Sequence, residues 1–254
     1  MKYLIVCVMA LAVITVSMPV GAAVPLANDL ASNYPPDPWG NGSNKGSGFG
    51  FTWQTSKSTA SSQGIGSSDV DVNGASFMLS APTNHYITVS RTFDTANGTR
   101  FLGVGQTFYG MFDPIAYNDD NASLSINLSN TAGMTAFTLS ASKKAGPGSP
   151  VDETPNYRYL GEFSKDTGVS ASQAVSFEYA RLGLSTFRLT LTPMGGTPVV
   201  INDTRTVGDI YGFDVNAFQG NMAFNNVGVG TVPEPASLSV IGLTAIGLLG
   251  RRRR

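Results

Sequence analysis

The chain has 254 residues, of which 42% are hydrophobic and 13% charged, with one cysteine and one histidine. This length suffices for one domain with a real core or for two small domains. When Lys2, Glu234 and the four terminal arginines are set aside, 11 basic residues face 16 acidic ones, and this mild acidity argues against nucleic acid as a partner, since affinity for phosphates needs many cations.

Residues 1–23 have the layout of a secretory signal peptide. Lys2 precedes an apolar run over residues 3–16, and the small residues at 21–23 fit a cleavage site, which we expect after Ala23. The only cysteine, Cys7, lies inside this segment. The mature protein would therefore contain no thiol, which excludes disulfides, zinc-thiolate sites and a cysteine nucleophile.

The body of the chain has the pattern of a β protein. Residues 24–48 are rich in Pro, Gly, Asn and Ser and predict an extended leader or a first edge strand. From residue 49 to residue 230, short segments with alternating apolar residues recur between turn residues. In the stretch SLSINLS, Leu124, Ile126 and Leu128 share one face, and serines and an asparagine share the other. No window predicts a long amphipathic helix.

The strands are predicted at regular intervals, and Asn-Gly pairs at 73–74 and 97–98 predict tight hairpin turns. This pattern favours one all-β domain over residues 49–230, an antiparallel β-sandwich of the jelly-roll type. The predicted strands cover residues 49–55, 75–80, 85–93, 101–112, 123–129, 134–141, 157–163, 175–180, 186–191, 199–201 and 221–229.

The sequence offers few ligands for a metal ion and no catalytic triad. His85 is the only histidine, no G-x-S-x-G motif supplies a serine, and we expect His85 to be a surface residue at a strand end. Asp69, Asp71 and Asn73 match the first half of an EF-hand loop, so calcium is the candidate cofactor. The closing acidic residue is missing, and the favoured interpretation is a hairpin turning at Asn73. Asp119 and Asp120 form a second acidic cluster, for which a solvated loop is favoured.

Glycan chemistry has two alternatives here. A glycosidase needs two carboxyl groups that face each other across a cleft, and Glu153, Glu162 and Glu178 form no such pair in the sequence. We therefore expect no enzymatic activity. Binding without catalysis needs exposed aromatic rings and hydrogen-bonding side chains. The candidate rings, for which core packing is the competing role, are those of Trp39, Trp53, Tyr109, Tyr117, Tyr157 and Tyr159.

The C-terminus combines three features in a fixed order. Pro233, Glu234 and Pro235 are followed by residues 236–250, which contain no ionisable side chain, and by Arg251, Arg252, Arg253 and Arg254. As a helix, the apolar segment would be about 22 Å long. A terminus with four charges on an all-apolar helix fits the cytoplasmic end of a membrane segment better than a buried core helix.

This order resembles the PEP-CTERM sorting signal of Gram-negative bacteria, here over residues 231–254. The resemblance implies that Pro233, Glu234 and Pro235 are recognised by an exosortase, that residues 236–250 lodge in the inner membrane, and that Arg251–Arg254 anchor the cytoplasmic side. The body also resembles the concanavalin-like jelly rolls, through the stretches VNGASFML, SRTFD and NMAFNNVGVG.

We therefore expect an exported protein, anchored transiently in the inner membrane and delivered to the cell surface or the extracellular biofilm matrix. Its partners would be an exosortase and exopolysaccharide, which it accompanies or binds without catalysis. The alternative is a secreted hydrolase that acts on such glycans, and a third hypothesis is a purely structural scaffold.

Overall fold

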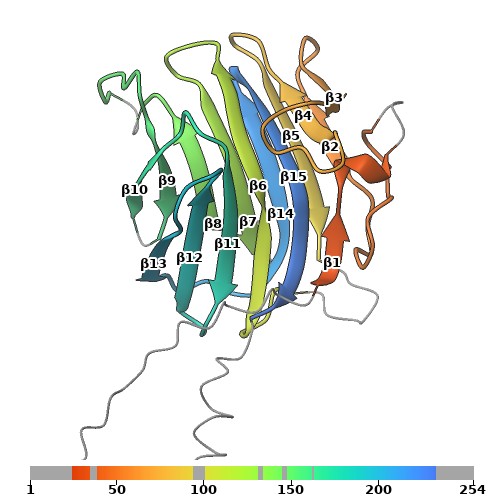
Figure 1. Ribbon diagram of the computed structural model, residues 1–254, viewed down its shortest axis with the longest axis vertical. Helices are drawn as coiled ribbons and strands as arrows, with labels where there is room; N and C mark the ends of the chain where they lie inside the picture. Colours follow the sequence, from red (N-terminus) through yellow and green to blue (C-terminus); the bar gives the residue numbers. More distant parts are fainter. Residues whose placement is uncertain are drawn as a thin grey trace, which may run out of the picture. The chain divides into compact units, whose positions relative to one another are not determined.

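The computed structural model describes residues 25–34, 39–93, 101–130, 134–144, 148–161 and 163–232. All of them belong to one compact unit. They form two antiparallel sheets that pack face to face (Figure 1), so the predicted antiparallel β-sandwich is confirmed. The predicted signal peptide, the turn at 97–98, Glu162, the sorting motif and the C-terminal membrane segment lie outside the described residues.

The first sheet has eight strands in the order β13-β12-β11-β6-β15-β4-β3, and β1 pairs with β15 beside β4. Its strands are β1 (Pro25–Asp29), β3 (Ser62–Gly66), β4 (Ser76–Ser80), β6 (Gln106–Tyr117), β11 (Val175–Arg181), β12 (Thr186–Pro193), β13 (Val199–Thr204) and β15 (Gly220–Thr231). One turn of 3₁₀ helix, η1 (Ala31–Asn33), follows β1. No helix in the described part of the chain is long and apolar enough to cross a membrane.

The second sheet has seven strands in the order β10-β9-β8-β7-β14-β5-β2. Its strands are β2 (Gln54–Lys57), β5 (Tyr86–Thr92), β7 (Ser123–Asn130), β8 (Thr135–Ser142), β9 (Asn156–Leu160), β10 (Ser164–Ser170) and β14 (Ile210–Phe218). Strand β14 lies between β7 and β5, both of which are distant from it in the sequence. By contrast, β7, β8, β9 and β10 follow one another in the chain, so the sheet combines local pairs with contacts that are distant in sequence.

Alternation along the strands builds the core between the sheets. Leu124, Ile126 and Leu128 are buried as predicted. The inward apolar residues of β5 and β12 are also buried, namely Ile87, Val89, Phe187, Leu189 and Leu191. An aromatic cluster joins the two layers, with Trp39 against Trp53 at 5.4 Å between ring centroids and Phe77 stacked on Phe224 at 5.0 Å. Such rings bury large areas, and their packing supplies much of the stability of a domain without disulfides.

The sequence missed some strands and displaced others. Strands β3, β10 and β14 were not predicted, because β3 and β10 are rich in polar residues and glycine and β14 contains an irregularity at Gly212. Strand β1 lies within residues 24–48, for which a first edge strand was one of the two expectations. The strand expected at 49–55 begins only at Gln54, since the backbone of Trp53 pairs with the loop residues Gly42 and Ser43. The strand expected at 101–112 begins at Gln106, after a turn at Gly105, whose φ is 83°.

A buried ion pair attaches residues 25–53 to the sandwich. Arg91, on β5, forms a salt bridge with Asp29, at the end of β1, and both side chains are fully buried. The Asp29 carboxylate also accepts hydrogen bonds from the Tyr34 hydroxyl and the Trp53 indole N–H, each at 2.9 Å. Burial raises the pKa of Asp29, although Arg91, Tyr34 and Trp53 oppose that shift. The segment predicted as a leader or first edge strand, residues 24–48, thus contributes the strand β1 and the core tryptophan Trp39.

At the opposite edge, one carboxylate joins the two sheets. Asp203 on β13 accepts hydrogen bonds from the Tyr159 hydroxyl of β9 at 2.9 Å and from the Lys165 ammonium of β10 at 2.6 Å. Desolvation raises the pKa of Asp203, but the hydrogen bonds from Lys165, the Thr204 N–H and Tyr159 outweigh it and hold that pKa below its usual value. This contact ties β13 of one sheet to β9 and β10 of the other.

Candidate functional site

The outer face of the seven-stranded sheet is covered by hydroxyl and amide side chains. On β5, β7, β8 and β14 the inward residues are apolar apart from Arg91 and Asn130, whereas the outward ones are almost all Ser, Thr or Asn. Among the described residues of these four strands, Asp214 is the only charged side chain that faces outward. The outward polar residues are Thr88, Ser90, Thr92, Ser123, Ser125, Asn127, Ser129, Thr138, Ser140, Ser142, Asp214 and Asn216.

Hydrogen bonds across the strands converge on Asp214. Thr138 Oγ1 donates to Asn127 Oδ1 at 2.8 Å, and Asn127 Nδ2 donates to Asp214 Oδ1 at 2.7 Å. Ser129 Oγ donates to Asp214 Oδ2 at 3.3 Å. The register places Thr138, Asn127 and Asp214 directly opposite one another on β8, β7 and β14, and Ser129 lies two residues after Asn127 on the same face of β7. One carboxylate oxygen is therefore well satisfied, and the other has only a long hydrogen bond.

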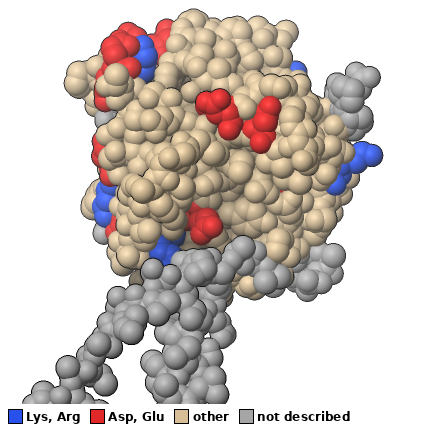
Figure 2. Space-filling view, viewed as in Figure 1, with Lys and Arg blue, Asp and Glu red and all other residues tan. Residues whose placement is uncertain are grey.

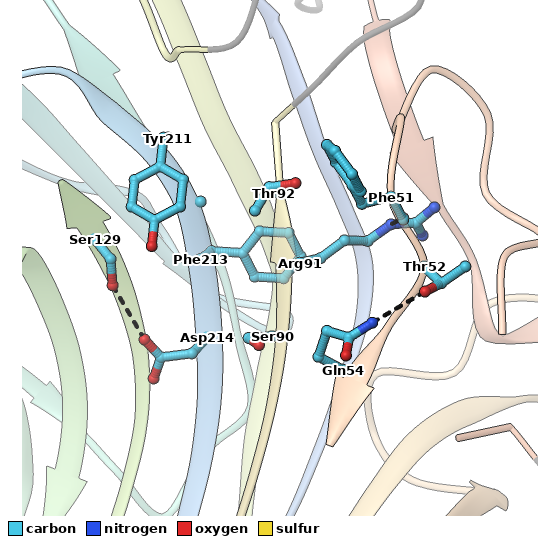
Figure 3. A pocket seen from close by; sticks show the side chains of 11 residues that line it. Phe51, Thr52, Gln54, Ser90, Arg91, Thr92, Ser129, Tyr211, Phe213 and Asp214 are labelled. Carbon is cyan, nitrogen blue, oxygen red and sulfur yellow. Dashed lines mark hydrogen bonds between the residues drawn. The ribbon is translucent and has the colours of Figure 1, made fainter. Parts of the chain in front are cut away.

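A hollow of about 230 Å³ opens beside Asp214, between β2, β5, β14 and β7. Its size lies just below the range of about 300–1,000 Å³ that is usual for small-molecule pockets. Figure 3 shows the rings of Tyr211 and Phe51 on its two sides, with Thr92 between them and Asp214 below. Phe51 is 55% exposed. The hollow thus combines aromatic walls with polar groups, and its other lining residues are Thr52, Gln54, Ser90, Arg91, Ser129, Gly212 and Phe213.

A β-bulge on β14 shapes this hollow. The register with β7 slips between Ile210, opposite Asn130, and Gly212, opposite Ser129, so that β14 has one extra residue. Because of the extra residue, Ile210 and Phe213 are both buried while Tyr211 is half-exposed between them. Bulges commonly redirect a side chain beside a functional site. A Cβ at position 212 would lie only 2.9 Å from the Arg91 carbonyl oxygen, so glycine also permits this close packing.

The environment of Asp214 makes it a strong acceptor. Burial raises the pKa of the Asp214 carboxyl, and the hydrogen bonds from Asn127 and Ser129 offset part of that shift. A carboxylate that has lost water gains more from a ligand that donates a hydrogen bond. Two charged side chains line the hollow, those of Asp214 and Arg91. Because Arg91 is neutralised by its ion pair with Asp29, the Asp214 carboxylate determines the charge of the site, which favours neutral groups that carry hydroxyls over anionic ones.

Aromatic side chains also mark the far end of this face. Tyr86 on β5 lies opposite Phe218 on β14, and both face outward, Tyr86 with 43% of its surface exposed. Thr92 at the hollow lies six positions after Tyr86 on β5, which corresponds to about 20 Å along a strand. The polar face between these two ends is thus long enough for an extended ligand.

The structure places the aromatic residues predicted for glycan stacking mainly in the core. Trp39, Trp53, Tyr157 and Tyr159 are buried, with at most 5% of their surface exposed. Their candidacy as stacking platforms was therefore wrong, because the sandwich needs large inward rings. Tyr109 and Tyr117 are half-buried on β6. The sequence analysis did not name Tyr211 and Phe51 as candidate stacking rings, although each lies in a short stretch that combines aromatic and polar residues, FTWQ at 51–54 and IYGFD at 210–214.

The candidate calcium loop forms the predicted hairpin. Asn73 and Gly74 both have positive φ, 56° and 76°, as a tight two-residue turn requires. Asp71 Oδ1 accepts hydrogen bonds from Ser76 Oγ and from the Ser68 N–H at 2.9 Å, so it serves the loop itself. Among the described residues there is no cluster of three His, Cys, Asp or Glu side chains suited to a metal ion.

The remaining candidates lie apart from the hollow. His85 precedes β5 and its Nδ1 lies 3.0 Å from Ser58 Oγ, at a strand end as predicted. Asp119 and Asp120 lie in the turn after β6, where Asp119 accepts a hydrogen bond from the Asn121 N–H.

The glutamates also lie apart from the hollow. Glu178 is exposed on the outer face of β11, and Glu153 forms a salt bridge with Lys143 at 2.6 Å. Figure 2, which looks onto the eight-stranded sheet, shows few charged side chains across its middle.

Comparison with known proteins identifies the C-terminus. Residues 231–254 match the family model described as the PEP-CTERM protein-sorting motif. This motif indicates export, transient anchoring in the membrane and delivery to the cell surface through an exosortase. The match covers less than a tenth of the chain and leaves the sandwich itself unassigned. No curated protein matches this chain in sequence.

Solved structures resemble the sandwich only distantly. A sialidase aligns with a TM-score of 0.45 and 11% identity over 70% of this chain, which is equivalent to 17% of the sialidase chain. A protein of unknown function with a galectin-like fold from Bacillus subtilis aligns at 0.42 and 11%, over 72% of this chain and 90% of its own. The Emp47p carbohydrate recognition domain aligns at 0.41 and 12%, over 81% and 95%. At these scores the similarity says nothing of function.

Proposed function

We propose that this chain, which carries the PEP-CTERM sorting motif, is a surface protein of a Gram-negative bacterium whose sandwich binds a neutral exopolysaccharide without catalysis. The observation that carries the proposal is the hollow at Asp214, whose lining combines a desolvated carboxylate with the aromatic rings of Tyr211 and Phe51. Sugar rings present apolar faces for stacking and hydroxyls for hydrogen bonding, and this arrangement is complementary to both.

Three further features support a neutral polymer as the ligand. The strands around the hollow carry hydroxyl and amide groups that both donate and accept hydrogen bonds. The carboxylate of Asp214 would repel acidic sugars. The polar face continues for about 20 Å from the hollow to Tyr86 and Phe218, which suits a chain of several sugars lying along β5 and β14.

Sorting is tested separately from binding. Replacing Pro233, Glu234 and Pro235 with alanine removes the two backbone constraints and the charge that an exosortase would read in an extended segment. We expect this variant to accumulate in the inner membrane, as measured by fractionation and immunoblotting of cells and medium. Alanine at Asp152 and Glu153, an exposed acidic pair on the sandwich, should leave sorting unchanged. Normal release of the motif variant would refute exosortase processing.

A hydrolase is the second candidate, because one pair of acidic residues meets on the other sheet. Asp69 donates its backbone N–H to Asp113 Oδ2 at 3.3 Å. Burial raises the pKa of Asp113, the hydrogen bond from the Asp69 N–H opposes that shift, and the Asp69 carboxylate adds a smaller increase. A carboxyl group with a raised pKa near a second carboxyl group is the combination that glycosidases use. If the protein is a hydrolase, incubation with exopolysaccharide should release reducing ends, and Asp113→Asn should abolish that release. We expect no release from either protein.

A further inference from the structure

Four apolar side chains are exposed at the end of the sandwich where β15 terminates. Phe101 and Val104 belong to the loop before β6, and Leu182 and Leu184 belong to the loop between β11 and β12. Their exposed fractions are 37%, 53%, 43% and 76% respectively. We call this group the apolar tip. Exposed apolar side chains that gather on neighbouring loops of a domain commonly mark a binding surface.

Backbone hydrogen bonds hold the two loops against each other and against the exit of the chain. The Gly105 N–H donates to the Arg181 carbonyl at 2.8 Å, and the Val232 N–H donates to the Gly105 carbonyl at 2.8 Å. The buried Arg181 guanidinium donates to the Leu102 carbonyl at 2.7 Å. The apolar tip is therefore a fixed part of the fold, and Val232, the last described residue, leaves the sandwich beside it.

The uncharged segment of the sorting signal follows Val232 closely in the sequence. Only three residues separate Val232 from residue 236, where the uncharged segment of the sorting signal begins. Four steps of about 3.5 Å allow at most about 14 Å between them. While the sorting signal is in the membrane, the apolar tip is consequently within reach of the lipid surface. Phenylalanine and leucine side chains are those that enter the interfacial region of a bilayer.

We propose that the apolar tip inserts into the headgroup region of the membrane while the protein is anchored, so that the bilayer itself is a second binding partner of the sandwich. This contact limits the tilt of the domain relative to the lipid surface. It would be lost when the exosortase releases the domain from its anchor. The proposal does not depend on glycan binding, since none of the four side chains lines the hollow.

The strand β6 provides a matched pair of positions for a test. Val104 lies just before its first residue and Ile115 near its last, about 35 Å away at the spacing of a strand. Both are exposed β-branched aliphatic residues, at 53% and 44%. Since Cys7 is the only cysteine, Cys7→Ser provides a background in which Val104→Cys or Ile115→Cys introduces a single thiol.

Each full-length variant is labelled with a polarity-sensitive fluorophore and reconstituted in phosphatidylcholine vesicles that contain a lipid with a nitroxide on its headgroup. We expect the label at position 104 to be quenched at least about twofold more than the label at 115, and to emit at shorter wavelength. Adding Leu184→Asp should reduce the quenching at 104.

Equal quenching at the two positions would overturn the proposal. The label at 104 could instead emit at shorter wavelength only at high protein concentration and remain unquenched by the nitroxide lipid. That result would assign the apolar tip to contact with a second copy of the chain and would overturn the proposal as well. Failure of either kind would leave the glycan-binding proposal intact, because the reconstituted samples contain no polysaccharide.

Discussion

Arg91→Leu is expected to destabilise the sandwich by about 3–5 kcal/mol, because it leaves the fully buried Asp29 carboxylate without its cation. The Asp29 carboxylate would retain only the hydrogen bonds from Tyr34 and Trp53. The loss should appear as a lower midpoint of guanidinium unfolding for residues 24–232. Arg188→Leu, on the outer face of β12, is the matched control and should change stability by less than about 0.5 kcal/mol.

The pH dependence of that variant has a defined sign. Burial raises the pKa of Asp29, and removing Arg91 takes away the largest opposing influence. A carboxyl group with a raised pKa in the folded state favours folding when it is protonated and loses that contribution as the pH rises through the raised pKa. The free energy of unfolding of Arg91→Leu should therefore be closest to that of the wild type in mildly acidic buffer and furthest below it at neutral pH. A constant difference across this range, or a loss below about 1 kcal/mol, would contradict the assigned role of the ion pair.

Asp214→Asn should weaken binding of a neutral polysaccharide by about tenfold or more, since a hydrogen bond to a charged acceptor contributes about 1.5–3 kcal/mol. Tyr211→Ala should cause a comparable loss, because it removes one wall of the hollow. Isothermal titration with purified exopolysaccharide measures both. Glu178→Gln, which removes an exposed carboxylate from the other sheet, is the control and should bind as the wild type does.

The same site predicts a pH dependence of binding. Because burial raises the pKa of Asp214, this carboxyl takes up its proton at a higher pH than an ordinary aspartate does. Affinity should fall as the pH decreases through that raised pKa, and the Asp214→Asn variant should show no such fall. Unchanged affinity in both Asp214→Asn and Tyr211→Ala, with unfolding midpoints like that of the wild type, would remove the hollow from the binding site.

The sequence predicted the fold class from local alternation. Leu124, Ile126 and Leu128 are buried as their period of two requires, and Asn73 and Gly74 form the hairpin that this pair favours. The stretch around Leu124 also assigned its serines and asparagine to one face. One strand of the polar face was thus predictable, because a single strand determines which of its residues share a face.

The hollow could not be predicted in the same way. It requires β14 to lie between β7 and β5, which are distant in sequence, and it requires the bulge that turns Tyr211 outward. That bulge also interrupts the alternation, so β14 was missed as a strand. The hydrogen bond from the Trp53 indole to Asp29 was equally inaccessible, because it depends on Asp29 of β1 meeting Arg91 of β5, which is distant in the sequence.

The central claim is that the outer face of the seven-stranded sheet binds a neutral glycan. Backbone amide chemical shifts of residues 24–232, followed by NMR during titration with neutral oligosaccharides from the exopolysaccharide, test it most directly. The predicted result is that the largest changes occur on β5, β7 and β14 around Gly212, while β6, β11 and β15 remain unchanged. Changes confined to the eight-stranded sheet, or none with any neutral glycan, would contradict it.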